Sequence, residues 1–351
     1  MQIGVLDIRI NNPLRKEWKK RNDRKKLRNR LHRVHGKKQA FHSKERFKKI
    51  ESFSPPTILS VRKNPEATIK FFNNILEKVK KINIMHTEIQ TYVIHIEMQC
   101  VMEITEDALM YLLTIAKNSR LRAKKKTILW RINSPTDKKA KEYLQNSGFI
   151  IFFEQHQSID TIECVDNMNI THGTNVDTEV MKKVCDFVKE KSNESVSTKF
   201  LYKMLTELMS NTTQHAYTNS NITFFHSWYI FLEKHENIMR VTFMDNGLGI
   251  PNTIRKKNTE KILKICGIMS EHKLVFSALK GEFRSETKNK NRGKGLPEIY
   301  EPSLNGNIKD LTIISNKAFY SEKNGQDLKN SLNGTMFYWK IECMKGENNE
   351  N

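Results

Sequence analysis

The sequence lacks several features that mark common classes of protein. It has only five cysteines in 351 residues, and no two of them form a CxxC pair. Their odd number and wide spacing argue against a disulfide framework and against a zinc site. No apolar run approaches the ~20 residues that cross a bilayer, and the N-terminus does not begin with a basic segment followed by an apolar one. These absences predict a cytoplasmic protein with no membrane partner.

Acidic residues are few near the N-terminus. Residues 11–50 hold 17 Lys and Arg against three acidic residues, so this stretch contributes 17 − 3 = +14 of the net charge of +21. It has few apolar residues to bury, and we therefore expect residues 1–50 to form a basic, mobile arm. The basic residues at 14–49 are suited to nonspecific nucleic acid or to an acidic partner, and a solubilising tail explains them equally well.

Strands and helices alternate in the pattern of residues 55–155. Helix-like segments at 67–81, 106–118 and 137–147 separate strand-like segments at 57–61, 91–104, 127–132 and 149–154. Such alternation is typical of βαβ units on a largely parallel sheet, and it predicts a small α/β domain. Residues 156–176 are polar and rich in turn residues, which indicates a linker or an entry strand.

The segment IEMQCVMEITEDALMYLLTIAKNSR, with the strand and helix that follow it, resembles STAS domains. In that family a serine in the turn before the helix can be phosphorylated. The corresponding position falls near Glu106 or Asp107, so we expect no phosphorylation switch there. The resemblance implies that residues 55–155 dock a protein partner, while a generic α/β regulatory layer fits the same pattern.

Residues 199–218 have helical periodicity on two faces. One face is apolar, and the other carries Glu207, Asn211 and His215 at intervals of four residues, which drift by only ~40° per step. An Asn oxygen is a neutral ligand for Mg²⁺, and Glu207 would then polarise an attacking water or hydroxyl. A solvated polar face is the alternative explanation of this spacing.

A carboxylate and two glycines follow the strand expected at 240–244. Asp245 ends that strand, and Gly247, Gly249 and Ile250 lead into a basic helix. Asn-Gly alone favours a hairpin turn, but the second glycine and the helix do not fit one. Small residues after a carboxylate at the end of a strand leave room for an adenine ring. The carboxylate can accept a hydrogen bond from the exocyclic amine of that ring.

Two further elements complete the pattern. The sequence RGKGL comprises Arg292, Gly293, Lys294, Gly295 and Leu296. A glycine-rich entry to a helix offers backbone N–H groups to phosphate, and the lysine adds a positive charge. The lysine-rich stretch before it indicates a lid. The last element, NGTMFYWKI at 333–341, opens a strand with a glycine and Thr335.

The order and spacing of these four elements resemble the N, G1, G2 and G3 boxes of the GHKL superfamily, which includes histidine kinases, anti-sigma-factor kinases, gyrase and MutL. ELMSN matches the N box, DNGLGI matches G1 and RGKGL matches G2. The resemblance covers about residues 177–342 and implies a Bergerat α/β sandwich, with helices layered on a mixed sheet. The expected fold class is thus α/β and α+β, with a disordered tail at 343–351.

The resemblance implies ATP and Mg²⁺ as ligands. Glu207 would be the general base, Asn211 the Mg²⁺ ligand, and Asp245 the acceptor for the adenine amine. Further contacts to the nucleotide would come from His215, Gly247, Gly249, Ile250, Arg292, Gly293, Lys294, Gly295, Leu296 and Thr335. Sensor kinases often carry a lysine where this sequence has Gln214, and His215-Ala216-Tyr217 is closer to the anti-sigma kinases.

Three functions stay open. In the first, a regulator binds Mg²⁺-ATP, hydrolyses it slowly and thereby switches its contacts with a partner, with an ATP-dependent dimer as one form of that switch. In the second, the protein phosphorylates a partner, as anti-sigma-factor or histidine kinases do. In the third, a nucleic-acid-associated ATPase uses the basic arm, and its affinity for nucleic acid falls with salt.

Overall fold

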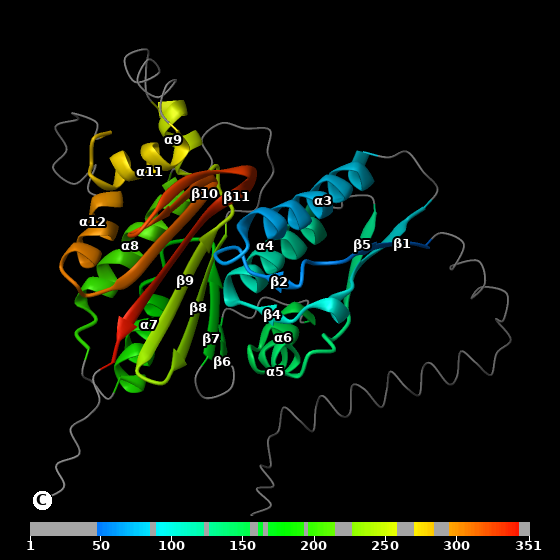
Figure 1. Ribbon diagram of the computed structural model, residues 1–351, viewed down its shortest axis with the longest axis horizontal. Helices are drawn as coiled ribbons and strands as arrows, with labels where there is room; N and C mark the ends of the chain where they lie inside the picture. Colours follow the sequence, from blue (N-terminus) through cyan, green and yellow to red (C-terminus); the bar gives the residue numbers. More distant parts are fainter. Residues whose placement is uncertain are drawn as a thin grey trace, which may run out of the picture.

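The computed structural model describes residues 48–84, 89–122, 126–154, 161–163, 168–192, 196–214, 227–257, 270–283 and 295–343. They form a mixed α/β fold in which helices and sheets are stacked in layers (Figure 1). The predicted arm up to residue 47, the end of the tail from residue 344, His215, and Arg292 to Lys294 lie outside the described residues. None of the described helices is long and apolar enough to span a membrane.

The N-terminal part contains a three-stranded parallel sheet with the strand order β1-β3-β5. A separate, short parallel ladder joins β2 to β4. The strands are β1 (Lys48–Phe53), β2 (Ile58–Leu59), β3 (Thr91–Ile96), β4 (Glu103–Ile104) and β5 (Thr127–Ile132). The helices are α3 (Pro65–Ile84), α4 (Glu106–Arg122), α5 (Lys138–Asn146) and α6 (Phe149–Glu154), with the short 3₁₀ helix η1 (Met98–Cys100).

Strands and helices alternate up to α5 as predicted, except that residues 91–104 form β3, η1 and β4 rather than one strand. Two further predictions need correction. The parallel sheet begins at Lys48, inside the predicted arm, because β1 is held by its ladder to β3 rather than by its own polar sequence. Residues 149–154 form the helix α6 and not a strand. A short apolar run fits either element, and here Phe149 and Phe153 pack one helical turn apart, with the Phe153 ring also against Trp130.

The C-terminal part is built on a six-stranded sheet with the order β10-β11-β9-β8-β7-β6. Every pair that the structure describes in it is antiparallel, whereas a mixed sheet was expected. Short connections such as the one between β8 and β9 join neighbouring strands, and these give antiparallel pairs. The strands are β6 (Thr161–Glu163), β7 (Met168–Gly173), β8 (Trp228–His235), β9 (Ile238–Asp245), β10 (Lys309–Ser321) and β11 (Gly325–Glu342).

The boundaries of this part differ from the predicted 177–342 at both ends. The stretch 156–176, predicted as a linker or an entry strand, supplies β6 and β7 at the edge of the sheet. Cys343, predicted to begin a disordered tail, is buried, and its backbone N–H donates to the Asn237 carbonyl. Neither segment has a strong periodicity of its own, so pairing with the sheet decides its structure.

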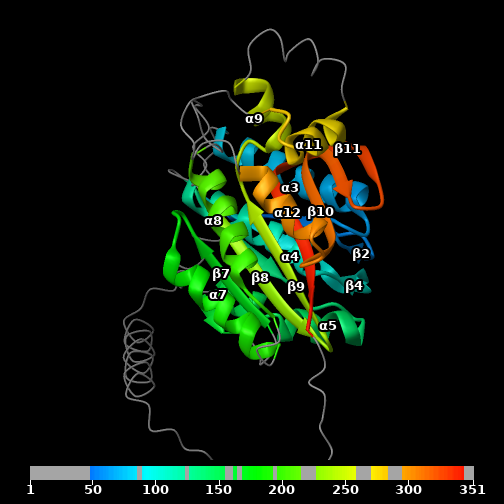
Figure 2. The ribbon, with the colours of Figure 1, turned by 90° about the vertical axis from the view of Figure 1, so that its left-hand side faces the viewer.

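Helices cover one face of the six-stranded sheet, and Figure 2 looks onto that side. Val241 and Phe243 of β9 point into the apolar cluster that these helices form with the sheet, while Met244 points to the opposite face. The helices of this part are α7 (Thr178–Lys191), α8 (Lys199–Gln214), α9 (Ile250–Lys257), α11 (Glu271–Leu279) and α12 (Gly295–Leu304).

The N-terminal part packs on that opposite face, with α3 and α4 against the strands β11, β9 and β8 (Figure 1). Phe72 and Tyr111 belong to the same apolar cluster as Met336 of β11 and Met244 of β9. Because both faces are covered, β8 has an almost uninterrupted apolar sequence, WYIFL, rather than an alternating one. The two parts of the chain therefore share one core.

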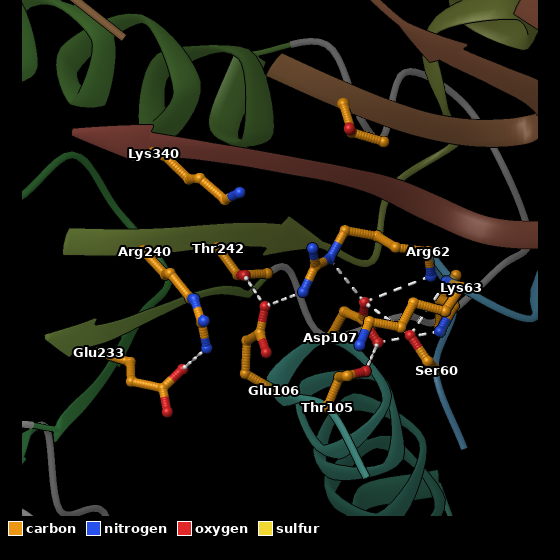
Figure 3. Close-up of polar contacts among 12 residues, drawn as sticks. Ser60, Arg62, Lys63, Thr105, Glu106, Asp107, Glu233, Arg240, Thr242 and Lys340 are labelled. Atoms are coloured by element: carbon orange, nitrogen blue, oxygen red, sulfur yellow. Dashed lines mark hydrogen bonds and ion pairs between the residues drawn. The ribbon is translucent and has the colours of Figure 1, made fainter. Parts of the chain in front are cut away.

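A charged cluster lies inside this shared core (Figure 3). The guanidinium of Arg62 forms ion pairs with Glu106 and Asp107 of α4, whose side chains are 3% and 0% exposed. Thr242 of β9 donates to Glu106 at 3.4 Å, and Arg62 also lies 3.5 Å from the centre of the Tyr338 ring of β11. Burial raises the pKa of Glu106, and Arg62 opposes that shift.

Candidate functional site

The helix α8 presents the predicted polar residues beside a buried apolar stripe. Met204, Leu205 and Leu208 are fully buried against the sheet, as their spacing predicts. Glu207 and Asn211 are half-buried on another face of the helix. The stripe thus orients α8 so that its carboxylate and amide point away from the sheet core.

Gly295, the first residue of α12, lies directly against these two side chains. A Cβ atom at this glycine would be 3.3 Å from Asn211 Oδ1 and 3.4 Å from Glu207 Oε2. The two helices pack together, and Lys203 of α8 forms ion pairs with Glu298 and Glu301 of α12 at 3.5 and 3.3 Å. The structure therefore brings the predicted helix face together with the end of the RGKGL sequence.

Asp245 is held at the end of β9 by its neighbours. The Gly247 backbone N–H donates to its Oδ1 at 2.7 Å, and Thr335 donates from both its backbone N–H and its hydroxyl. Thr335 lies opposite Asp245 in the ladder between β11 and β9. Burial nevertheless raises the pKa of Asp245 from 3.8 to about 6, and these hydrogen bonds offset only part of that effect.

The turn after Asp245 is fixed by two residues of β10 that the sequence did not single out. Ser315 accepts from the Ile250 backbone N–H at 2.7 Å and contacts Thr335 Oγ1 at 3.0 Å. Asn316 donates to the Leu248 carbonyl at 2.9 Å. Gly249 has a φ of +85°, and a Cβ there would lie 2.3 Å from Asn316 Oδ1. Ser315 and Asn316 stand in an ordinary strand sequence, so no local motif marks them.

Gly334 has a conformation and an environment that exclude a side chain. Its φ is +108°, and a Cβ would lie 2.1 Å from the Asp245 carbonyl oxygen. Gly306 has a φ of +72° but nothing within 4 Å. We expect Gly306→Ala to cost about 1 kcal/mol from its backbone conformation alone, and Gly334→Ala to cost about 3 kcal/mol or more because overlap with Asp245 adds to strain. Urea unfolding of both variants measures this, and equal losses would contradict the close approach.

The residues around Asp245 lie on the same side of the sheet as Glu207, Asn211 and Gly295. Asp245 has the same parity along β9 as Phe243, which faces the helices. Ile250 and Leu296 pack against the large apolar cluster on that face and also against the small cluster of Ile254, Leu274 and Ala278. The start of α9, close to Asp245, and the start of α12, close to Glu207 and Asn211, are therefore joined through shared apolar contacts.

Not all predicted residues can be placed in this arrangement. His215, Arg292, Gly293 and Lys294 fall outside the part of the chain that the structure describes. Within that part, no group of three or more His, Cys, Asp or Glu side chains could hold a metal ion. Neither the comparison with protein-family models nor the search of curated proteins returned a match for this sequence.

Proposed function

We propose that this chain binds Mg²⁺-ATP on the helix side of the six-stranded sheet, in a domain of the Bergerat type. The observation that carries the proposal is the position of Gly295 directly against the side chains of both Glu207 and Asn211. A glycine at the start of a helix lets a phosphate approach the backbone N–H groups of the first turn. A carboxylate and an amide beside that point are suited to the metal and the reaction that accompany a phosphate.

The residues present fit these ligands. Mg²⁺ keeps several of its waters and binds substrate phosphates, so a single protein ligand such as Asn211 is sufficient. Bound Mg²⁺ would offset the negative charge of the phosphates. The other end of the nucleotide would lie at Asp245, whose carboxylate accepts a hydrogen bond from an exocyclic amine, with Gly247 leaving room for the ring. The space beside Gly249 is taken by the Asn316 side chain, so Gly249 would act through the shape of the turn. Glu207 would take the proton from an attacking water or hydroxyl.

The biological use of this site is proposed on the same basis. The N-terminal part, which we propose to be STAS-like, covers the opposite face of the sheet and shares its core. A change at the nucleotide site can therefore alter a partner's docking surface through packed elements, which favours a regulatory ATPase. A kinase is the second candidate, because Glu207 can activate a partner's hydroxyl as well as water. A regulatory ATPase releases inorganic phosphate from ATP without a protein substrate, whereas a kinase transfers the phosphate to a partner.

The pH dependence of binding tests the role of Asp245. Its pKa of about 6 means that it is ionised at neutral pH and protonated at pH 5. Protonation adds an O–H donor to the carboxyl and weakens its oxygens as acceptors for Gly247, Thr335 and the adenine amine. We therefore expect ATP affinity to fall about tenfold from pH 7.5 to pH 5. Protonation of Asp245 does not itself destabilise the fold, since the raised pKa of Asp245 in the folded state means that this group adds stability as the pH falls.

Fluorescence titration with a labelled ATP analogue measures this effect, and Asp245→Asn is the matched control. The Asn side chain has an NH₂ group in place of one carboxylate oxygen. This NH₂ group cannot accept a hydrogen bond, so it faces either the donors of Gly247 and Thr335 or the adenine amine without pairing. We expect the variant to bind weakly at both pH values, with the pH dependence removed. A variant that keeps the wild-type pH profile would show that another group, such as a phosphate of the nucleotide, is responsible.

A further inference from the structure

A short segment of β11 is held by the N-terminal helices along its whole length. Glu66 of α3 accepts from the Lys329 backbone N–H at 2.7 Å and from the Asn330 side chain at 3.0 Å. Asn73 of α3 donates to the Ser331 carbonyl at 3.2 Å. The segment 329–333 ends two residues before Thr335, so the part of the chain that contacts α3 runs directly into the candidate site.

The segment ends in a β-bulge. In the ladder between β10 and β11, Ser315 pairs with Thr335, but the next residue, Asn316, pairs with Leu332. Asn333 and Gly334 are thus the extra residues of the bulge, and they have no partners in the register with β10. Bulges of this kind redirect a strand and are frequent next to functional sites.

Tyr111 of α4 provides a hydrogen-bond acceptor for Asn333, which has no partner in the ladder with β10. Its hydroxyl accepts from the Asn333 backbone N–H at 2.9 Å. The side chain is 1% exposed, and its ring packs edge-on against Phe72 of α3, with 4.9 Å between the ring centres. A tyrosine fixed in this way holds the bulge at a defined distance from α4.

The bulge in turn contacts Asp245. Gly334 follows Asn333 directly, and its α-carbon lies so close to the Asp245 carbonyl that no side chain fits between them. Thr335 comes next and donates to the Asp245 carboxylate from its backbone and its hydroxyl. A continuous series of contacts therefore leads from Tyr111 through the bulge to the carboxylate.

We propose that Tyr111 is a positioning residue for base recognition: by holding the bulge at Asn333 it sets the geometry of Thr335 and Asp245. This inference rests on the proposed function, because it takes Asp245 as the acceptor for the purine amine. It makes the N-terminal part a component of the nucleotide site without any contact between Tyr111 and nucleotide. Nucleotide binding and the packing of α4 on the sheet are then coupled, and each stabilises the other.

The test compares ATP with inosine triphosphate, which carries the same phosphates and has a carbonyl in place of the exocyclic amine. Equilibrium titration gives the dissociation constant of each nucleotide. For Tyr111→Phe, which removes only the hydroxyl, we expect ATP to bind about three- to tenfold more weakly, as for the loss of one hydrogen bond. Binding of inosine triphosphate should stay within about twofold of wild type, because it does not use the amine acceptor.

Tyr143→Phe is the matched control. The Tyr143 hydroxyl of α5 is also buried and interacts electrostatically with Glu233 and Arg240 of the sheet, but it has no hydrogen-bond partner within the described structure. We expect this variant to keep the wild-type preference for ATP. Glu66→Ala, which frees the same β11 segment from α3, should lower that preference in the same direction, and it serves as the second variant if Tyr111→Phe does not fold.

The outcomes separate this inference from the proposed function. If the wild-type chain binds neither nucleotide, the proposed function fails. If wild type prefers ATP while Tyr111→Phe and Glu66→Ala keep the full preference, only the positioning role is overturned. A loss that is equal for both nucleotides also overturns it, because general destabilisation of the domain explains such a loss. A selective loss for ATP supports it.

Discussion

Replacing Arg62 with Met will lower the free energy of unfolding by about 3–5 kcal/mol, because the change leaves two buried carboxylates without their cation. Glu106 and Asp107 are 3% and 0% exposed, and the pairs with Arg62 lie between α4 and the sheet (Figure 3). Burial lowers the pKa of Arg62, but the two carboxylates more than reverse this, and the net shift is upward. Urea unfolding monitored by far-ultraviolet circular dichroism measures the loss.

The loss will depend on pH in a defined direction. Burial raises the pKa of Glu106, so this group becomes neutral more readily in the folded state than in the unfolded one. Without Arg62 that tendency grows, and the destabilisation will be largest at neutral pH and will shrink as the pH falls. Lys63→Met is the control, since the pair between Lys63 and Glu103 is exposed and its loss costs less than about 1 kcal/mol. Equal losses for the two variants would contradict a buried cluster.

Replacing Glu207 with Gln will lower the rate of ATP turnover by about 10²- to 10⁴-fold, the usual contribution of a general base. The amide keeps the size of the side chain beside Gly295 but cannot take a proton. Binding of Mg²⁺-ATP should stay within about threefold of wild type, since the proposed role of Glu207 lies in the reaction and not in binding. Release of inorganic phosphate and equilibrium titration measure the two effects separately.

Glu301→Gln is the matched control for this experiment. Glu301 lies on α12, forms an ion pair with Lys203 of α8 at 3.3 Å and is 57% exposed. Its replacement therefore removes one negative charge from the same pair of helices, as Glu207→Gln does, at a side chain that does not contact Gly295. Turnover by this variant should equal that of wild type. If Glu207→Gln loses binding along with turnover, Glu207 holds the ligand or the fold, and the assignment of a base is wrong.

The elements of the candidate site could be predicted because each has a strong local pattern. The apolar stripe of α8, the strand that ends at Asp245 and the helix that begins at Gly295 all lie where the sequence predicts them. Which of these elements pack against each other could not be predicted, because the periodicity of a helix does not show which other helix it contacts. Only the packing of α12 on α8 places Gly295 against Asn211.

Other parts of the structure could not be predicted from local pattern. Ser315 and Asn316 form hydrogen bonds to the turn that contains Gly249, next to a β-bulge with a shift in register. The sequence of a strand does not specify such a shift. The strand β1 is polar and is formed by its ladder to β3, whereas the apolar segment Phe149–Glu154 is a helix although its composition suits a strand. In these cases tertiary contacts override local propensity.

The most direct test of the central claim is calorimetric titration of the purified chain with ATP in the presence of Mg²⁺, beside Asp245→Asn and Asn211→Ala. We expect saturable one-to-one binding by wild type. Affinity should be lower by about tenfold or more for Asp245→Asn, the loss expected for a hydrogen bond to a charged group. Binding by Asn211→Ala should no longer depend on Mg²⁺. No heat of binding, or the same affinity for Asp245→Asn as for wild type, would contradict an ATP site at Asp245.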